Sequence, residues 1–125
     1  MSKFFFWLKL AWWFKTPFVF LFDREYHRAT PDDLQELMRE GAATIANGPF
    51  SADGHDCDDF AAELKGLASR KHLNWIGTVY GWRGAIPWRN RHAWNVALVD
   101  GGYWYIEPQK MQAAGKGYHA WVVIL

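Results

Sequence analysis

The stretch that decides the fold runs from Arg91 to Gln109 and reads RHAWNVALVDGGYWYIEPQ. From His92 onward the side chains alternate between two faces, which is the periodicity of a β-strand. Asp100-Gly101-Gly102 then supplies a turn, because glycine accepts the positive φ angle that tight hairpins need. Aromatic residues of high β propensity follow the turn. The stretch therefore predicts a β-hairpin that brings His92, near its entrance, close to Glu107, near its exit.

A histidine with a carboxylate partner is part of a catalytic triad, which also needs a nucleophile. Cys57 is the only cysteine in the sequence, so it is the only thiol candidate. It stands at the start of a predicted helix, where free backbone N–H groups and the helix dipole favour a thiolate. Three neighbouring aspartates oppose the thiolate unless they point away or cap the helix. We expect Cys57, His92 and Glu107 to be catalytic.

A loop rich in tryptophan and arginine precedes the hairpin, from Gly81 to Asn90. Arginines make this wall of the expected cleft positive, which fits either an anionic substrate or a solvated basic face. Its tryptophans either pack as a lid or stack on substrate. The sequence thus nominates Trp82, Trp88, Arg89 and Arg91 as substrate-binding residues.

The composition fits one domain, because 125 residues are enough for a single core. The formal net charge is +1, so the total charge does not point to nucleic acid as a partner. The charge is uneven: residues 23–63 hold eleven acids and three bases, whereas residues 65–99 hold six bases and no acid. One cysteine excludes an internal disulfide and an all-cysteine metal site. We expect neither a metal nor a cofactor.

Two helices are expected before the strands. Thr30 is a suitable N-cap, and Pro31 with two aspartates suits the first turn, so a helix is predicted from Thr30 to about Ala46. A second helix is predicted from about Cys57 to Lys71, with an apolar stripe along one face. Extended segments are expected at about 74–80, 93–99, 103–107 and 118–125. This order predicts an α+β fold with two helices packed on a small antiparallel sheet.

Residues 4–22 are almost continuously apolar, interrupted by Lys9, Lys15 and Pro17. The longest uncharged run falls short of the roughly 20 residues that a spanning helix needs. No small-residue cleavage site follows, which argues against a secretory signal. The segment either packs on the core or contacts a partner or a membrane interface, and we favour a protein partner or homo-oligomer through Phe4–Phe22. We therefore expect an apolar arm and linker over residues 1–29 and the main domain over residues 30–125.

The residues around the three candidates carry a family resemblance. Gly54-His55-Asp56-Cys57-Asp58-Asp59-Phe60-Ala61 resembles the nucleophile motif of the transglutaminase-like cysteine peptidases. The later motifs resemble that family's histidine and acid strands, where the acid is usually aspartate before proline; they are His92-Ala93-Trp94, Asp100-Gly101-Gly102, Trp104 and Glu107-Pro108. The resemblance covers roughly residues 54–109.

The resemblance implies a papain-like core and a cysteine hydrolase with a Cys57–His92–Glu107 triad. Such an enzyme would attack an amide or peptide bond and pass through a thioester acyl-enzyme. The substrate would be a protein or a peptidoglycan stem peptide, which would suit a bacterial or phage enzyme. A cell-wall endopeptidase of the NlpC kind, whose nucleophile also follows an aspartate, is a related alternative.

A different class of protein stays open. A chain that keeps this fold without chemistry would be a structural or interaction component of a virion or secretion assembly, held by the aromatic arm. Cytoplasmic, membrane-peripheral and virion-associated locations are all compatible with the sequence. His55, two residues before Cys57, is either a loop histidine or a second base or metal ligand. His27, His72 and His119 have no such constellation around them, and a Cys-His zinc site lacks the ligand count and spacing of a structural site.

Overall fold

A computed structural model describes residues 2–45, 56–86 and 90–125. Along the chain these residues form α1 (Lys3–Phe14), β1 (Val19–Phe20), α2 (Pro31–Thr44), α3 (Cys57–Arg70), β2 (Ile76–Arg83), β3 (Arg91–Val99), β4 (Gly102–Glu107), β5 (Gln112–Ala113) and β6 (Tyr118–Ile124). The predicted helix starts after Thr30 and at Cys57 are confirmed. The predicted end of the first of these helices, near Ala46, lies outside the described residues.

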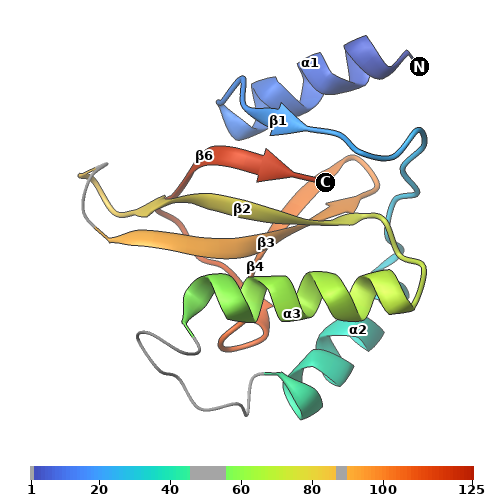
Figure 1. Cartoon of the computed structure of the whole chain (residues 1–125), viewed down its shortest axis with the longest axis vertical. Helices are drawn as coiled ribbons and strands as arrows, with labels where there is room; N and C mark the ends of the chain where they lie inside the picture. Colours follow the sequence, from blue (N-terminus) through green and yellow to red (C-terminus); the bar gives the residue numbers. More distant parts are fainter. Residues whose placement is uncertain (1, 46–55, 87–89) are drawn as a thin grey trace.

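The strands form one six-stranded sheet in the order β1-β6-β2-β3-β4-β5. β2 pairs antiparallel with both β3 and β6, and β4 pairs antiparallel with β3 and β5. β1 pairs in parallel with β6, which makes the sheet mixed. Figure 1 shows α3 with α2 on one side of this sheet and α1 on the other.

The predicted hairpin is confirmed as β3 and β4. Their pairing runs from Asn95 opposite Ile106 to Val99 opposite Gly102. The turn between them contains Gly101 at a φ of +80°, a conformation that side chains with a Cβ rarely adopt. β3 is buried on both faces at its centre, where Trp94 and Asn95 are each 0% exposed. β3 therefore lies in the core, and β4, which pairs with it, ends beside it at the buried Glu107.

β2 and β6 approach each other unusually closely at Gly81. The register between these strands shifts between Tyr80 and Gly81, as in a β-bulge. A Cβ at Gly81 would lie 1.9 Å from the backbone oxygen of His119, so only glycine fits there. This close approach lets β6 continue beside β2 and brings Tyr118 opposite Arg83.

The predicted fold class, a papain-like or transglutaminase-like core with two helices on a small antiparallel sheet, is wrong. The N-terminal residues form a third helix and an edge strand, and β1 adds a parallel pair to the sheet. Leu10 and Phe14 of α1 are 0% and 3% exposed. Burial of these apolar side chains against the sheet stabilises the fold. The fold prediction rested on the hairpin and the two later helices, whose local patterns do not show that the N-terminal run packs on the same sheet.

Within the described ranges, none of the helices combines the length and the hydropathy that crossing a bilayer would take. α1, the most apolar of them, has 12 residues. At a rise of about 1.5 Å per residue it is about 18 Å long, about three fifths of a hydrocarbon core that is roughly 30 Å thick.

We predict that Phe14→Ala lowers the free energy of unfolding by about 3–5 kcal/mol, because the change leaves a cavity where a buried ring packed. The Phe14 ring centroid lies 4.8 Å from that of Tyr103 and 6.1 Å from that of Tyr105. Urea denaturation followed by circular dichroism measures the change. Trp12→Ala is the matched control, since Trp12 is 83% exposed on the same helix and its loss should cost less than about 0.5 kcal/mol. Equal effects of the two substitutions would show that α1 does not pack on the sheet in solution.

Candidate active site at the N-terminus of α3

Cys57 is the first residue of α3 and is half-buried. Asp59, one of the neighbouring aspartates, caps the start of the helix: its Oδ2 atom accepts a hydrogen bond of 3.1 Å from the backbone N–H of Asp56. The backbone N–H of Asp58 donates toward the Cys57 thiol. The helix start therefore turns at least one carboxylate to its own backbone and one free N–H to the sulfur.

His92 and Glu107 meet where the hairpin opens. The His92 Nε2 atom lies 2.6 Å from Glu107 Oε2, and their side chains are only 7% and 8% exposed. Tyr118 donates its hydroxyl to the same Oε2 atom at 2.9 Å. The backbone N–H of Gln109 donates to Glu107 Oε1 at 3.4 Å. Three donors thus surround the Glu107 carboxylate, which suits the ionised form and holds it in one orientation.

The thiol completes a hydrogen-bonded line of three side chains. The Cys57 side chain is hydrogen-bonded to His92, whose Nε2 atom is already used by Glu107, so the other ring nitrogen is the one left for sulfur. The backbone N–H of Ala93 also donates toward the Cys57 thiol. Pairing of β3 with β4 begins only at Asn95, so the first residues of β3 are open toward the start of α3. The sequence prediction that Cys57, His92 and Glu107 come together is therefore met in space, and their catalytic role stays a prediction.

The three groups shift one another's pKa values. The hydrogen bond from His92 lowers the pKa of the Cys57 thiol against the opposing effect of burial. Burial alone would lower the pKa of His92, but its hydrogen bonds to Cys57 and Glu107 raise that pKa to about 9. Burial acts to raise the pKa of Glu107, and the hydrogen bond and charge of His92 outweigh it, so that this pKa is lowered. The shifts therefore favour the charged forms of all three groups, a thiolate, an imidazolium and a carboxylate, over their neutral forms.

These shifts also set the pH range in which the site stabilises the fold. The folded-state pKa of His92 lies above its ordinary value of 6.5, so its contribution is complete below pH 6.5 and is lost as the pH rises through about 9. The folded-state pKa of Glu107 lies below its ordinary 4.5. Its contribution is present above that value and is lost as the pH falls through the lowered pKa.

Two tyrosines at the site were not foreseen from the sequence. Tyr118 reaches Glu107 from β6, and only the register of β6 against β2 could have located it. Tyr80 lies close enough to the charges of Asp58 and Cys57 that they add to burial in raising the pKa of its hydroxyl. Both tyrosines lie in segments that the sequence predicts as strands, without any indication of a site.

The predicted substrate-binding residues are not all brought together. The Trp82 ring stacks on that of His119, with centroids 4.9 Å apart, and lies tilted against that of Trp121, with centroids 5.2 Å apart. Arg91 is exposed opposite Trp82 at the start of β3. Trp88 and Arg89 lie outside the described residues, as do Gly54 and His55 of the nucleophile motif. The structure thus gives Trp82 a packing role, and a substrate-binding role for these residues stays a prediction.

One cluster among the described residues has the composition of a cation site. Ligand atoms of Asp56, Asp58 and Asp59 lie within 4.8 Å of one another. Asp59 already accepts from the backbone at the helix start, and exposed acidic groups often gather without a cation. Helix capping therefore explains Asp59 and solvent exposure explains Asp58, whereas Asp56 Oδ1 is buried without a hydrogen-bond partner among the described residues.

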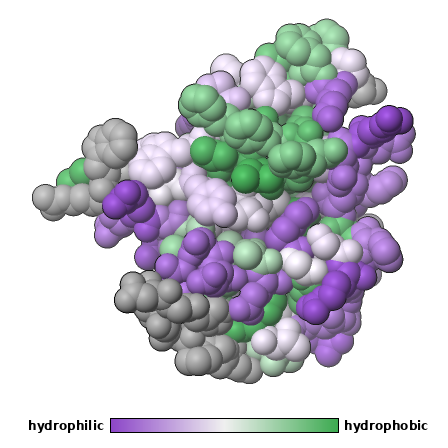
Figure 2. Space-filling model, viewed as in Figure 1, coloured by the Kyte–Doolittle hydropathy of each residue, from purple (hydrophilic) through white to green (hydrophobic). Residues whose placement is uncertain are grey.

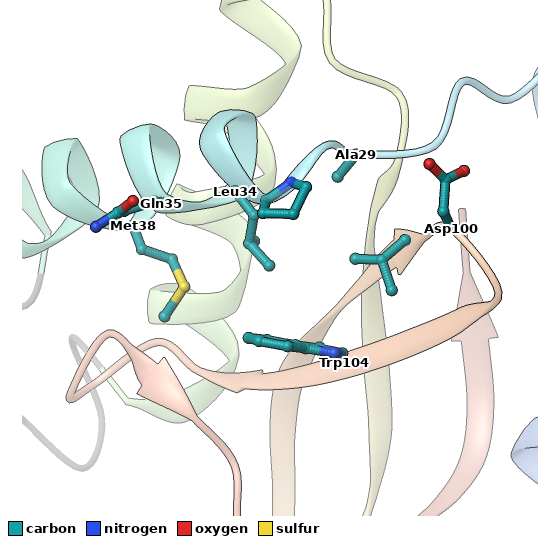
Figure 3. A pocket seen from close by; sticks show the side chains of 8 residues that line it. Ala29, Leu34, Gln35, Met38, Asp100 and Trp104 are labelled. Carbon is teal, nitrogen blue, oxygen red and sulfur yellow. The ribbon is translucent and has the colours of Figure 1, made fainter.

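A hollow lies away from the thiol, between α2 and the β3–β4 turn. It has a volume of about 590 Å³ and a mostly apolar lining. Figure 3 shows Leu34 and Met38 pointing from α2 toward the indole of Trp104 on β4, with Gln35 and Asp100 at the margins. Trp104 is 53% exposed, so its ring is available from solvent. This hollow was not predicted, because it depends on how far α2 lies from the hairpin.

No protein-family model matches the sequence, and no curated protein sequence matches it. Two solved structures resemble the fold. One is the PSL1a–E64 complex, with a TM-score of 0.70 and 21% identity, where the match covers 86% of this chain and 43% of that chain. The other is Polyporus squamosus lectin bound to the human-type influenza-binding epitope Neu5Aca2-6Galb1-4GlcNAc, with a TM-score of 0.68, 21% identity, and coverage of 86% and 41%. The chain spans less than half the length of either neighbour, and the likeness shows the fold alone.

These neighbours contradict the family prediction. The transglutaminase-like assignment, its papain-like core and the thiol protease or hydrolase activity drawn from it are withdrawn, because the fold is shared with a lectin. The non-catalytic alternative, a virion or secretion component, is withdrawn on the same finding, as is the cell-wall endopeptidase. The physical reason is that a nucleophile, a base and an acid recur in the same geometry on unrelated folds. Short motifs around Cys57, His92 and Glu107 thus identify a local arrangement and not a family.

Proposed function

We propose that this chain carries out covalent catalysis through the thiolate of Cys57. The observation that supports it is the hydrogen-bonded line from Cys57 through His92 to Glu107, in which the imidazole and the carboxylate are almost fully buried. A cysteine that only fills space in a core needs neither a charged imidazole beside it nor a carboxylate behind that imidazole. The proposal concerns the chemistry of the thiol and does not include the peptidase assignment withdrawn above.

The proposed reaction is a group transfer from an electrophilic carbon. The Cys57 thiolate attacks this carbon, so that a carbon–sulfur bond forms and the bond from the same carbon to its leaving group breaks. The imidazolium of His92 gives its proton to the leaving group, and an acceptor later takes the group from sulfur as His92 recovers a proton. Glu107 contacts neither the electrophilic carbon nor the leaving group in this scheme. It acts as a positioning residue that stabilises the charged ring of His92. Tyr118 in turn holds Glu107 through its hydroxyl.

We predict that E64, the compound in complex with PSL1a in one structural neighbour, forms a stable adduct with this chain at Cys57. The proposed thiolate would join an electrophilic carbon of a bound compound through a carbon–sulfur bond. Intact-mass spectrometry at neutral pH should show one added molecule of E64, and peptide mapping should place it on Cys57. His92→Ala should slow adduct formation about a hundredfold or more, because it removes the imidazolium that stabilises the thiolate and acts as the general acid. The matched control is His119→Ala, since His119 is exposed and lies on β6. Equal rates in these two variants would contradict the proposed activation of the thiol.

We predict a separate effect on the pH profile of thiol labelling. In the native chain the rate of reaction with iodoacetamide should reach half of its maximum at a pH below 9.0, because the pKa of Cys57 lies below that ordinary value. Glu107→Gln should lower the pKa of His92 from about 9, since it removes the charge that stabilises the imidazolium. The ring proton signals of His92, followed by NMR against pH, measure that shift directly. An unchanged His92 titration in Glu107→Gln would contradict the positioning role of the carboxylate.

A second candidate function is binding of a carbohydrate in the hollow at Trp104. The observation that favours it is an exposed indole face bordered by apolar side chains, with an amide and a carboxylate at its margins. Aromatic faces pack on the C–H faces of sugar rings, and polar margins bind their hydroxyl groups. The carboxylate of Asp100 disfavours an acidic sugar, so we infer a neutral one. The apolar wall from Leu34 and Met38 further suits the methyl of an N-acetyl group.

We predict that N-acetyllactosamine perturbs backbone amide NMR signals of Asp100 and Trp104, and that lactose, which lacks the N-acetyl group, does so at higher concentration only. Trp104→Ala should abolish the perturbation, because it removes the face on which the sugar packs. Trp12→Ala is the control, since Trp12 is more exposed than Trp104 and lies on α1. Binding that survives in Trp104→Ala would contradict this candidate and leave the thiol proposal untouched.

A further inference from the structure

One surface of the molecule is apolar without being covered by the described residues. We call it the aromatic face and define it by its exposed side chains. Its members, with their exposed fractions, are Phe4 (62%), Phe5 (63%), Leu8 (42%) and Trp12 (83%) from α1, with Phe18 (59%), Phe20 (49%) and Phe22 (74%) from the extended segment around β1. The members of the segment alternate with inward residues, so they point to one side. Figure 2 shows hydrophobic residues gathered over α1, β1 and β6 and hydrophilic ones over α2 and α3.

The two parts of this face belong to one rigid unit. Trp7 of α1 donates its indole N–H to the backbone oxygen of Val19 in β1 at 3.1 Å. Leu10 and Phe14 fasten the opposite side of α1 to the core. α1 therefore has apolar side chains on both sides, and the sheet covers only one of them. A stripe of large apolar side chains at this density marks an interaction surface.

The charges around the face decide between the candidate occupants. Residues 2–22 contain Lys3, Lys9 and Lys15 and no acid. Lys9 and Lys15 each lie three positions from Trp12, and Lys9 Nζ lies 4.7 Å from the ring centroid of Trp13. Beyond the face follow Asp23, Arg24 and Glu25, whose charges sum to minus one. Tryptophan and phenylalanine with flanking lysines are the composition of helices that lie in a membrane interface.

We infer that the aromatic face docks on the surface of an anionic lipid bilayer. The rings would enter the boundary between headgroups and acyl chains, and the lysines would pair with acidic headgroups. A second copy of this chain fits less well, because two such faces would bring six lysines together without an acid. The chain would lie on the bilayer, since α1 is too short to cross it. α3 lies on the other side of the sheet from α1 (Figure 1).

Sedimentation of the full chain with vesicles tests this inference. Vesicles of phosphatidylcholine with phosphatidylserine should bind the chain, and vesicles of phosphatidylcholine alone should bind it more weakly. Replacing Lys9 and Lys15 by glutamine should lower the partition coefficient on the anionic vesicles about 25-fold, at about fivefold per lysine, with little change on the neutral ones. Phe4→Gln with Trp12→Gln should lower it roughly tenfold or more on both. Both members of each pair are solvent-accessible in the fold, so circular dichroism and the unfolding midpoint should stay unchanged.

Ile86→Gln is the matched control, because Ile86 is 52% exposed and lies outside the aromatic face. Its binding to anionic vesicles should equal that of the native chain. Native binding that does not differ between the two vesicle types would overturn the inference, as would binding that the Phe4 and Trp12 substitutions leave intact. A concentration-dependent dimer without vesicle binding, abolished by those substitutions, would overturn it and assign the face to a second copy. A native chain that stays monomeric and binds neither vesicle would overturn it in favour of a protein partner.

Discussion

The buried side chain of Asn95 joins the two elements on which the candidate site depends. Its amide nitrogen donates to the backbone oxygen of Ala61 in α3 at 2.9 Å and to that of Gly77 in β2 at 3.1 Å. Asn95 is 0% exposed, so these two bonds form in an apolar surrounding where an unpaired amide would cost about 1–3 kcal/mol. This requirement favours one position of α3 along β3. With that position set, the first residue of α3 lies beside the first residues of β3, and the thiol meets the imidazole.

Asn95 also marks the end of the pairing between β3 and β4, and the candidate site lies just beyond this point, at the margin of the core. β3 is buried along most of its length, yet its pairing with β4 stops at Asn95. The opening leaves Ala93 N–H directed at the Cys57 thiol and leaves His92 free to reach both Cys57 and Glu107. Burial of this ring would by itself favour the neutral form. The thiolate and the carboxylate on either side reverse that preference, so the charged state depends on all three groups and not on His92 alone.

The local pattern of the sequence was enough to predict the elements that carry the site. The hairpin followed from alternation and from the glycines of its turn, and the start of α3 followed from its capping residues. The long-range placement was out of reach, because the register of β6, the bulge at Gly81 and the contact of Tyr118 with Glu107 join residues far apart in the chain. Residues 4–22 show the same limit. A run that is apolar on every side does not tell which side meets the sheet, so α1 and β1 were expected as an arm.

The family assignment failed for a related reason. Motifs around a nucleophile, a base and an acid are selected by the distances that the chemistry needs, and those distances can be met on many scaffolds. What the motifs do specify is the order in which the three groups enter: a thiol at a helix start, then a histidine at the beginning of a strand, then an acid at the end of the next. In this chain that order is combined with a sheet whose edge strand β1 directly follows the aromatic helix α1. The helix that presents the thiol and the helix that presents the aromatic face lie on opposite sides of the sheet.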